Sequence, residues 1–570
     1  MKNRKILKLK KLINLYNLDG YLVPKNDAYF SEFALPDRLK IISNFSGSAG
    51  FAIVLKKENF LFVDGRYTIQ AKIQAGKFFK IIEVPKFLPK NILKKFKKKL
   101  SIGFDPQLFT NSSLKKKFNG ICNLFPISEN LIDKIHKDRK RTLVNPFYKL
   151  NDIITGEGMS SKINRLVKIL KSKKIDNIFI SAPENVAWLL NIRGKDSPNS
   201  PIPNCKIILT HDKKIYFFSC PKKIYQIKNK KNYKHFNFCN YKNFPKIIKH
   251  LKGNSFCIDG STCSISNEYI IKSSFKVKAD IDPCYYMKSI KNRSEIKNMI
   301  NTHIKDGLAL TKFIFWIKNV NKKKITETMA QDKLEKFRKL NKNYLFPSFN
   351  TIASAGANGA IVHYRATKKS DKLIKKSDIF LCDSGGQYNY GTTDVTRTIC
   401  FSKPKNHIKN IFTKVLKGHI AVANSNLKIH CNGKLIDILA RKSLKKSGMD
   451  YQHGTGHGVG FYSNVHEGPQ AISKFNTIKI KKGMVLSNEP GFYKKGKFGI
   501  RIENLLYVNR VKKDLFFENL TLAPIDKDLI NFKILSNEEK NYLFRYHLDV
   551  YTKLSKYLNN NEKKWLASFI

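Results

Sequence analysis

The segment DIFLCDSGGQYNYGTTDVTRTICF, residues 378–401, decides the fold of the C-terminal part of this 570-residue chain. Its apolar ends predict two strands, and the Ser-Gly-Gly sequence at 384–386 supplies turn chemistry between them. Asp383 ends the first strand, and Asp394 lies on the second. We therefore expect a hairpin that brings two carboxylates together near one end.

Four further segments of this region carry side chains able to bind metal or transfer protons. Glu489 ends a hydrophobic strand, and strand alternation places Arg501 and Glu503 on one face. The segments are SAGANGAIVHY (354–364, with His363), HGTGHGVGFYSNVHEGP (453–469, with His453, His457 and His466), GMVLSNEPGFY (483–493) and GIRIENLLYV (499–508).

Together these segments predict a metal site. Four carboxylates and an imidazole at the ends of apolar strands would be costly to bury together without a cation. Two divalent ions that share bridging carboxylates would neutralise them. A donor set rich in oxygen, with one nitrogen and no thiolate, favours Mn²⁺, while Co²⁺ or Zn²⁺ could also fit.

The histidine ligand is left open by the spacing alone. His453 and His457 have the i, i+4 spacing of a zinc-binding helix, but glycines at 454, 456 and 458 disfavour a helix there. We expect a loop and a strand, with one of the two histidines as a ligand and the other beside it.

The five segments resemble those of the Xaa-Pro aminopeptidases (aminopeptidase P), a family of pita-bread metallopeptidases, in their large three-domain form. They occur in the family's order and with nearly its spacing. The resemblance covers essentially the whole chain, because it includes DAYFSEFALPDRLKIISNFSGSAGFAIV (27–54), FVDGRYTIQA (62–71) and ENVAWLLNIRG (184–194). It implies hydrolysis of the N-terminal Xaa-Pro bond of peptides by a water that two metal ions activate, and it implies a homodimer.

The resemblance also implies a role for each matching residue. Glu489 would be the general base toward the attacking water as well as a ligand. The implied ligands of the two ions are Asp383, Asp394, His457, Glu489 and Glu503. The histidines implied to contact substrate or assist proton transfer without binding metal are His363, His453 and His466, of which His363 and His466 would bind the substrate.

Helix and strand patterns alternate with similar lengths in two successive parts of the N-terminal half, which predicts two related α/β domains. With the resemblance, the expected fold is α/β and α+β multidomain. It comprises two creatinase-like α/β domains at 1–140 and 155–285, a pita-bread catalytic domain at 290–515, and a C-terminal extension at 516–570 packed on that domain. The stretch 134–142 has little apolar periodicity and is expected to be a connector.

Two local expectations concern helices. Leu7, Leu12, Leu15 and Leu18 fit the apolar face of an amphipathic helix at the N-terminus. The segment ENVAWLLNIRG predicts a short helix that ends at Gly194.

The charge of the chain is strongly basic, with 107 Lys+Arg against 43 Asp+Glu and a formal net charge of +64. The lysines are spread over every segment, so the charge indicates a coding-composition bias and not a nucleic-acid-binding face. No apolar run approaches the ~18 residues of a membrane span. The expected partners are peptides with proline at the second position, with neither nucleic acid nor membrane.

The ten cysteines indicate the compartment. They form no CxxC pair and several lie in apolar runs, a pattern typical of reduced, buried thiols. The N-terminus is basic but lacks the unbroken apolar stretch of a secretory signal. We therefore expect a cytoplasmic protein.

Two alternatives from the same fold remain open at this point. A prolidase would act on Xaa-Pro dipeptides, but prolidases usually carry one N-terminal domain, whereas the sequence predicts two. A metal-free pita-bread binding protein would have lost ligands, whereas all five implied ligands are present.

Overall fold

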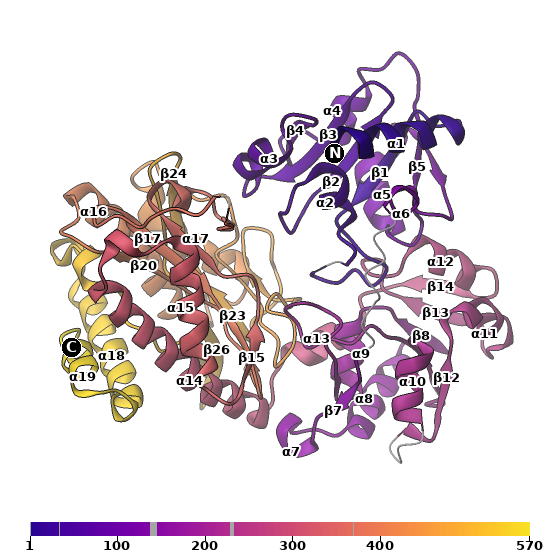
Figure 1. Ribbon diagram of the computed structural model, residues 1–570. Helices are drawn as coiled ribbons and strands as arrows, with labels where there is room; N and C mark the ends of the chain where they lie inside the picture. The colour runs from indigo at the N-terminus through magenta and orange to yellow at the C-terminus, as the bar shows by residue number, and fades with distance from the viewer. Residues whose placement is uncertain (1, 34, 137–144, 229–232, 369) are drawn as a thin grey trace. The chain divides into compact units, whose positions relative to one another are not determined.

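The computed structural model describes residues 2–33, 35–136, 145–228, 233–368 and 370–570 (Figure 1). The chain forms two compact units. Unit 1 comprises Met1–Asp152 and Glu157–Tyr285, and unit 2 comprises Ile153–Gly156 and Tyr286–Ile570. No helix among the described residues combines the length and the apolar character needed to cross a membrane.

The first part of unit 1 is a six-stranded mixed sheet with helices on both faces. Strand β2 and the centre of β3 are apolar because both faces are buried there. Ala52 and Val54 face the core under α1, α2, α3 and α6, while Phe51 and Ile53 face the core under α4 and α5. In spatial order the strands are β4 (Lys80–Val84), β3 (Asn59–Asp64), β2 (Phe51–Leu55), β1 (Gly20–Pro24), β5 (Ser101–Phe104) and β6 (Asn123–Pro126). The helices are α1 (Lys2–Leu15), α2 (Arg38–Ser43), α3 (Thr68–Ala75), α4 (Pro89–Leu93), α5 (Asn111–Phe118) and α6 (Leu131–Ile135).

The second part of unit 1 repeats this topology. Its sheet has the same succession of parallel and antiparallel pairings as the first sheet, which confirms the prediction of two related α/β domains. The strands are β12 (Phe236–Cys239), β11 (Ile215–Phe218), β10 (Lys206–Thr210), β8 (Asn177–Ile180), β13 (Ser255–Ile258) and β14 (Lys276–Ala279). The helices are α8 (Met159–Ser172), α9 (Pro183–Leu189), α10 (Pro221–Lys228), α11 (Phe244–His250) and α12 (Ile265–Lys272).

Unit 2 combines antiparallel sheets with two helix pairs. α14 (Arg293–Asn319) and α15 (Glu327–Lys339) cover the sheet of β16 (Ile352–Ala355), β17 (Ile379–Ser384) and β20 (Val395–Cys400), with Phe313, Leu334 and Phe380 in one core. α16 (Asn406–Ala423) and α17 (Gly433–Lys445) cover β23 (Val485–Asn488) and β26 (Asn504–Val511), with Val422 and Leu486 in another.

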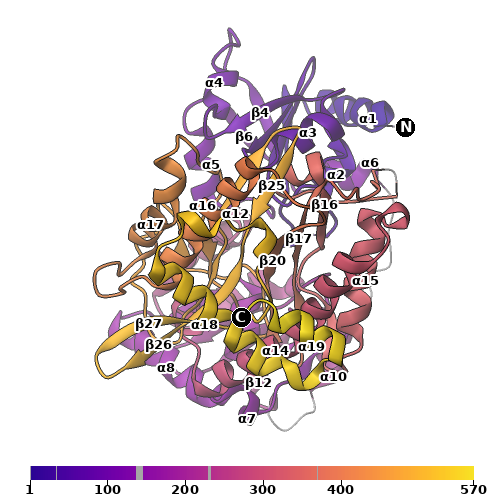
Figure 2. The same ribbon diagram turned by 90° about the vertical axis from the view of Figure 1, so that its left-hand side faces the viewer.

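The remaining elements complete unit 2. Figure 2 shows α18 (Asn537–Leu554) and α19 (Asn560–Ala567) of the C-terminal region lying against α14. The remaining strands are β15 (Tyr344–Pro347), β18 (Gly386–Tyr388), β19 (Gly391–Thr392), β21 (Gly456–His457), β22 (Ala471–Ile472), β24 (Gly491–Lys494), β25 (Phe498–Arg501) and β27 (Asp514–Asn519). The chain enters unit 2 briefly within α7 (Asp152–Thr155) and finally within α13 (Pro283–Ser289). The short strands β7 (Tyr148–Lys149) and β9 (Ile192–Arg193) belong to unit 1.

The structure corrects the simple hairpin expected at residues 378–401. β17 and β20 do pair, with Asp383 opposite Thr396, but the residues between them form a second hairpin, β18–β19, which pairs with β15 in another sheet. Gly385 makes no turn; a Cβ there would lie 2.0 Å from the carbonyl oxygen of Thr393. The glycine is needed for close approach of two backbones.

Two helix predictions are also wrong in detail. The buried face of α1 is formed by Ile6, Leu9 and Ile13, whereas Leu7 and Leu15 are exposed. Several apolar residues in a short helix fit more than one face, and packing decides between them. α9 ends at Leu189, because the following residues turn into β9.

The other local predictions have mixed outcomes. The ten cysteines, all among the described residues, form no disulfide, and seven of them are buried, but Cys220 is exposed. Of the predicted connector, residues 134 and 135 belong to α6, and 137–142 lie outside the described residues.

Candidate metal centre

Five separate segments bring the predicted ligands to one place in unit 2. Asp383 lies in β17, and Asp394 directly precedes β20. His457 ends β21, Glu489 directly follows β23, and Glu503 lies between β25 and β26. Backbone hydrogen bonds join these segments, from Glu489 N to Thr455 O (2.7 Å) and from Glu503 N to Thr396 O (3.2 Å).

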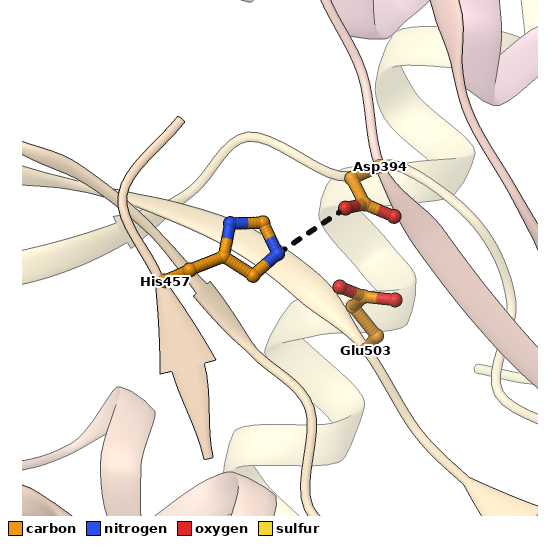
Figure 3. A group of neighbouring side chains, drawn as sticks. All are labelled: Asp394, His457 and Glu503. Carbon is orange, nitrogen blue, oxygen red and sulfur yellow. Dashed lines mark ion pairs between the residues drawn. The ribbon is translucent and has the colours of Figure 1, made fainter. Parts of the chain in front are cut away.

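The side chains converge within ligand-sharing distances. His457 Nε2 lies 3.5 Å from Asp394 Oδ2 and 3.5 Å from Glu489 Oε1. One ligand atom each from Asp394, His457 and Glu503 lies within 4.8 Å of the other two, and Figure 3 shows these three side chains pointing toward one another. Asp383 joins them through Arg501, whose Nη2 donates to Asp383 Oδ2 at 2.6 Å.

Burial and the close spacing of these groups shift several of their pKa values. Burial raises the pKa of Asp383 to about 6, with Arg501 opposing the shift and the charges of Asp394 and Glu489 adding to it. Burial, followed by the charge of Asp394, raises the pKa of Glu503 well above its usual range. Burial would lower the pKa of His457, but the hydrogen bond to Asp394 and the charge of Glu489 outweigh it and raise that pKa to about 9.

Residues that the sequence did not single out hold the carboxylates in place. Thr396 Oγ1 donates to Glu503 Oε2 at 2.7 Å and accepts from Arg501 Nε at 3.1 Å. Arg501 Nη1 donates to the hydroxyl of Tyr493 at 2.7 Å. Strand alternation gave a signal for Thr396, which lies two residues after Asp394. Tyr493 had none, because its contact depends on how β24 folds back on β25.

The segments that carry the three predicted non-ligand histidines also lie around this group. His453 Nε2 is 2.9 Å from the Tyr493 hydroxyl, and the ring of His466 lies 4.2 Å from the ring of His457, centroid to centroid. His363 follows Val362, whose carbonyl oxygen lies 3.5 Å from Arg501 Nη1. The structure thus gathers these segments around the carboxylates.

Comparisons with known proteins match every part of the chain. The models for Metallopeptidase family M24 and for the C-terminal region of peptidase M24 match residues 297–510 and 513–568. The Creatinase/Prolidase N-terminal domain matches 5–135 and 138–295. The probable Xaa-Pro aminopeptidase P of Laccaria bicolor is 35% identical over 603 residues, which cover 99% of this chain and 92% of that protein. The chain belongs to the aminopeptidase P family of M24 metallopeptidases.

Solved structures agree with this membership. The X-prolyl aminopeptidase of Caenorhabditis elegans, described as a cytosolic enzyme with a di-nuclear active site, matches with a TM-score of 0.92 and 31% identity over 100% of this M24 chain and 99% of that one. A prolidase of Thermococcus sibiricus matches 65% of this chain and 98% of its own, with a TM-score of 0.53 and 25% identity. The expected fold class, two creatinase-like domains followed by a pita-bread domain, is confirmed.

The residues of this M24 metallopeptidase fit a pair of divalent cations. Asp383 Oδ1 is buried and has no hydrogen-bond partner in the described part of the chain, while its Oδ2 is held by Arg501. An orphaned carboxylate oxygen of this kind is costly unless a cation meets it. The donor set is rich in oxygen and contains no thiolate, which suits hard divalent ions.

Proposed function

We propose that this chain is a metal-dependent aminopeptidase that hydrolyses the N-terminal Xaa-Pro bond of peptides. The observation that carries the proposal is the group of Asp394, His457 and Glu503, whose ligand atoms lie within 4.8 Å of one another. Its support is the full-length similarity to proteins named Xaa-Pro aminopeptidase.

We assign the binding of two divalent ions, most simply Mn²⁺, to the converging side chains. When bound, such ions supply Lewis acidity that lowers the pKa of a nearby water and neutralises the buried carboxylates. The ligands in this assignment are Asp383, Asp394, His457, Glu489 and Glu503.

The chain's own residues then handle the proton and the substrate. The carboxylate of Glu489 accepts the proton of the attacking water. Ser487 Oγ orients this carboxylate by donating a hydrogen bond to its Oε1 at 3.1 Å. His466 or His363 donates a hydrogen bond to the oxyanion that develops on the first peptide carbonyl. His453, fixed by Tyr493, completes the substrate-facing histidines.

Proline at the second position explains why a dedicated site is needed. An Xaa-Pro bond has no N–H, and its proline φ is fixed near −65°. Peptidases that hold a substrate through that N–H lose a contact, so the site must recognise the ring and the free N-terminus instead.

Peptide cleavage followed by mass spectrometry tests the proposal. Xaa-Pro tripeptides, Xaa-Pro dipeptides and Met-Ala peptides are each offered with Mn²⁺ or with chelator. Metal-dependent release of the first residue from the tripeptide supports an aminopeptidase. Cleavage of dipeptides alone would instead identify a prolidase, and binding without cleavage would identify a metal-free binding protein.

The two N-terminal domains favour the aminopeptidase over the prolidase. The C. elegans aminopeptidase spans this chain from end to end, whereas the T. sibiricus prolidase accounts for 65% of it. We further propose a cytoplasmic location. We also propose a homodimer, and size-exclusion chromatography with light scattering would test this oligomeric state.

A further inference from the structure

We propose that Glu467 is a positioning residue for the imidazole of His457. Two buried lysines hold its side chain, and its main-chain N–H shares the carbonyl oxygen of Gly458 with the His457 ring. The inference rests on the proposed function, because it takes His457 as a metal ligand through Nε2.

The side chain of Glu467 is held at both oxygens. Lys288 Nζ lies 2.8 Å from Oε2, and Lys291 Nζ lies 2.6 Å from Oε1. All three side chains are at most 2% exposed. Lys291 is itself fixed by a backbone hydrogen bond to Gly483 O at 2.9 Å, so the lysines anchor Glu467 to α13 and to the segment before α14.

The backbone of Glu467 reaches the candidate ligand through one shared acceptor. Glu467 N donates to Gly458 O at 2.8 Å, and His457 Nδ1 lies 2.9 Å from the same oxygen. A ring that donates from Nδ1 to a carbonyl leaves Nε2 as the coordinating nitrogen. Nε2 is the atom that faces Asp394 and Glu489.

Two glycines make this close packing possible. A Cβ at Gly458 would lie 2.0 Å from Glu467 O, and a Cβ at Gly460 would lie 2.9 Å from Glu467 Oε2. Gly458 N also donates to Gln470 O at 3.0 Å. Both ends of the 458–470 segment are therefore packed against Glu467 or its neighbours.

The same segment carries His466, the residue before Glu467, whose ring lies 4.2 Å from that of His457. A loop without such an anchor could place the two imidazoles in several ways. A buried carboxylate with both oxygens paired is held in one orientation. We therefore assign to Glu467 the role of orienting the His457 ring, and not a net contribution to the stability of the fold.

Variants at the three charges test the proposal. Lys288→Met and Lys291→Met each leave Glu467 paired with the one remaining lysine. Glu467→Gln removes the carboxylate charge that both lysines contact. Three quantities are measured: Mn²⁺ affinity by chelator competition, the visible spectrum of the Co²⁺-loaded protein, and kcat and KM. Lys223→Met, which breaks the similarly buried pair with Asp196 in unit 1, is the matched control.

For Glu467→Gln we expect Mn²⁺ to bind about 10- to 100-fold more weakly, as for other outer-sphere partners of a metal ligand. The Co²⁺ spectrum should change, and kcat should fall more than KM rises. The single lysine variants should show smaller changes of the same kind, and the control should show none.

Wild-type Mn²⁺ affinity and an unaltered Co²⁺ spectrum in Glu467→Gln would overturn the proposal. If that variant does not fold, unaltered affinity and spectrum in both lysine variants would overturn it equally. A wild-type protein that binds Mn²⁺ but cleaves no Xaa-Pro peptide would overturn the proposed function and leave this inference standing.

Discussion

Arg501 is the permanent cation among the buried carboxylates of unit 2. A guanidinium stays charged at any physiological pH and donates in fixed directions. Arg501 uses Nη2 for Asp383 Oδ2 and Nη1 for Tyr493, so Asp383 Oδ1 remains available to a metal ion. Arg501 therefore lowers the free-energy cost of burying these carboxylates together. It also determines which oxygen of Asp383 stays free of a hydrogen bond from the described residues.

At the residue scale, Asp394→Asn should abolish turnover, with a loss larger than the roughly 100-fold typical of outer-sphere changes. The amide keeps the shape but removes a charge, so bound metal should fall while the apo protein stays folded. Metal analysis, peptide cleavage and circular dichroism check this. Asp282→Asn, at a buried aspartate of unit 1, is the control, and persistent Mn²⁺-dependent activity of Asp394→Asn would refute the assignment.

His466→Ala should separate catalysis from metal binding. We expect kcat to fall by about 100-fold, the lower range for removal of a proton-transfer group, with nearly full metal occupancy. Steady-state kinetics and metal analysis on the same sample decide. An equal loss of both quantities would mean that His466 binds metal.

At the element scale, β10 contributes a buried lysine that ties the two α/β domains of unit 1 together. Lys206 Nζ donates to Ala28 O at 2.8 Å and lies 5.2 Å and 5.1 Å from the ring centroids of Tyr29 and Tyr241. Burial lowers the pKa of Lys206 to about 8. The charged form is thus disfavoured in the folded state.

This shift predicts a pH-dependent stability. Between about pH 8 and the usual lysine pKa the unfolded chain binds more protons, so folding gains stability as pH rises. Relative to Lys206→Met, the wild type should gain at most about 1.4 kcal/mol per pH unit above pH 8 and show a constant difference below it. Denaturant unfolding from pH 7 to 9.5 measures this; the exposed Lys249→Met is the control, and parallel pH profiles for wild type and Lys206→Met would contradict the prediction.

At the scale of the whole molecule, one buried arginine connects the C-terminal region to the candidate metal centre. Arg397 donates to the carbonyl oxygen of Glu503 at 2.7 Å, to that of Ala523 at 2.8 Å and to the hydroxyl of Tyr546 at 2.8 Å. α18, which carries Tyr546, is thereby connected to the backbone of a candidate ligand. The centre and the C-terminal region should unfold together.

Metal addition should therefore stabilise unit 2 as a whole. A ligand that binds only the folded state at a hundredfold excess over its Kd adds about 2.7 kcal/mol. Calorimetry with Mn²⁺ or with chelator should show a metal-dependent transition and one that metal leaves unchanged, from unit 1. In Asp394→Asn the metal-dependent shift should shrink, and a shift as large as that of the wild type would argue against the site.

The carboxylates of the candidate site could be picked out from the sequence because their neighbours are chemically distinctive, whereas the choice of His457 over His453 came from the resemblance to the family. Asp383 and Glu489 stand next to apolar runs, which mark the ends of strands in the sequence. Glycines surround His457 and mark a loop. The alternation that put Arg501 and Glu503 on one side also agrees with the contacts. The domain boundaries and the roles of these residues stay predictions.

The sequence by itself determined the composition of the site, the alternation of strands and helices, and the repeated α/β domains, because these depend on local periodicity and residue chemistry. Only the tertiary structure decided the second hairpin at 386–392, the buried face of α1, and the attachment of Glu467 to Lys288 and Lys291. Those features depend on partners about forty residues or more away in the sequence, or on competition between similar apolar faces, and short-range patterns carry no information about either.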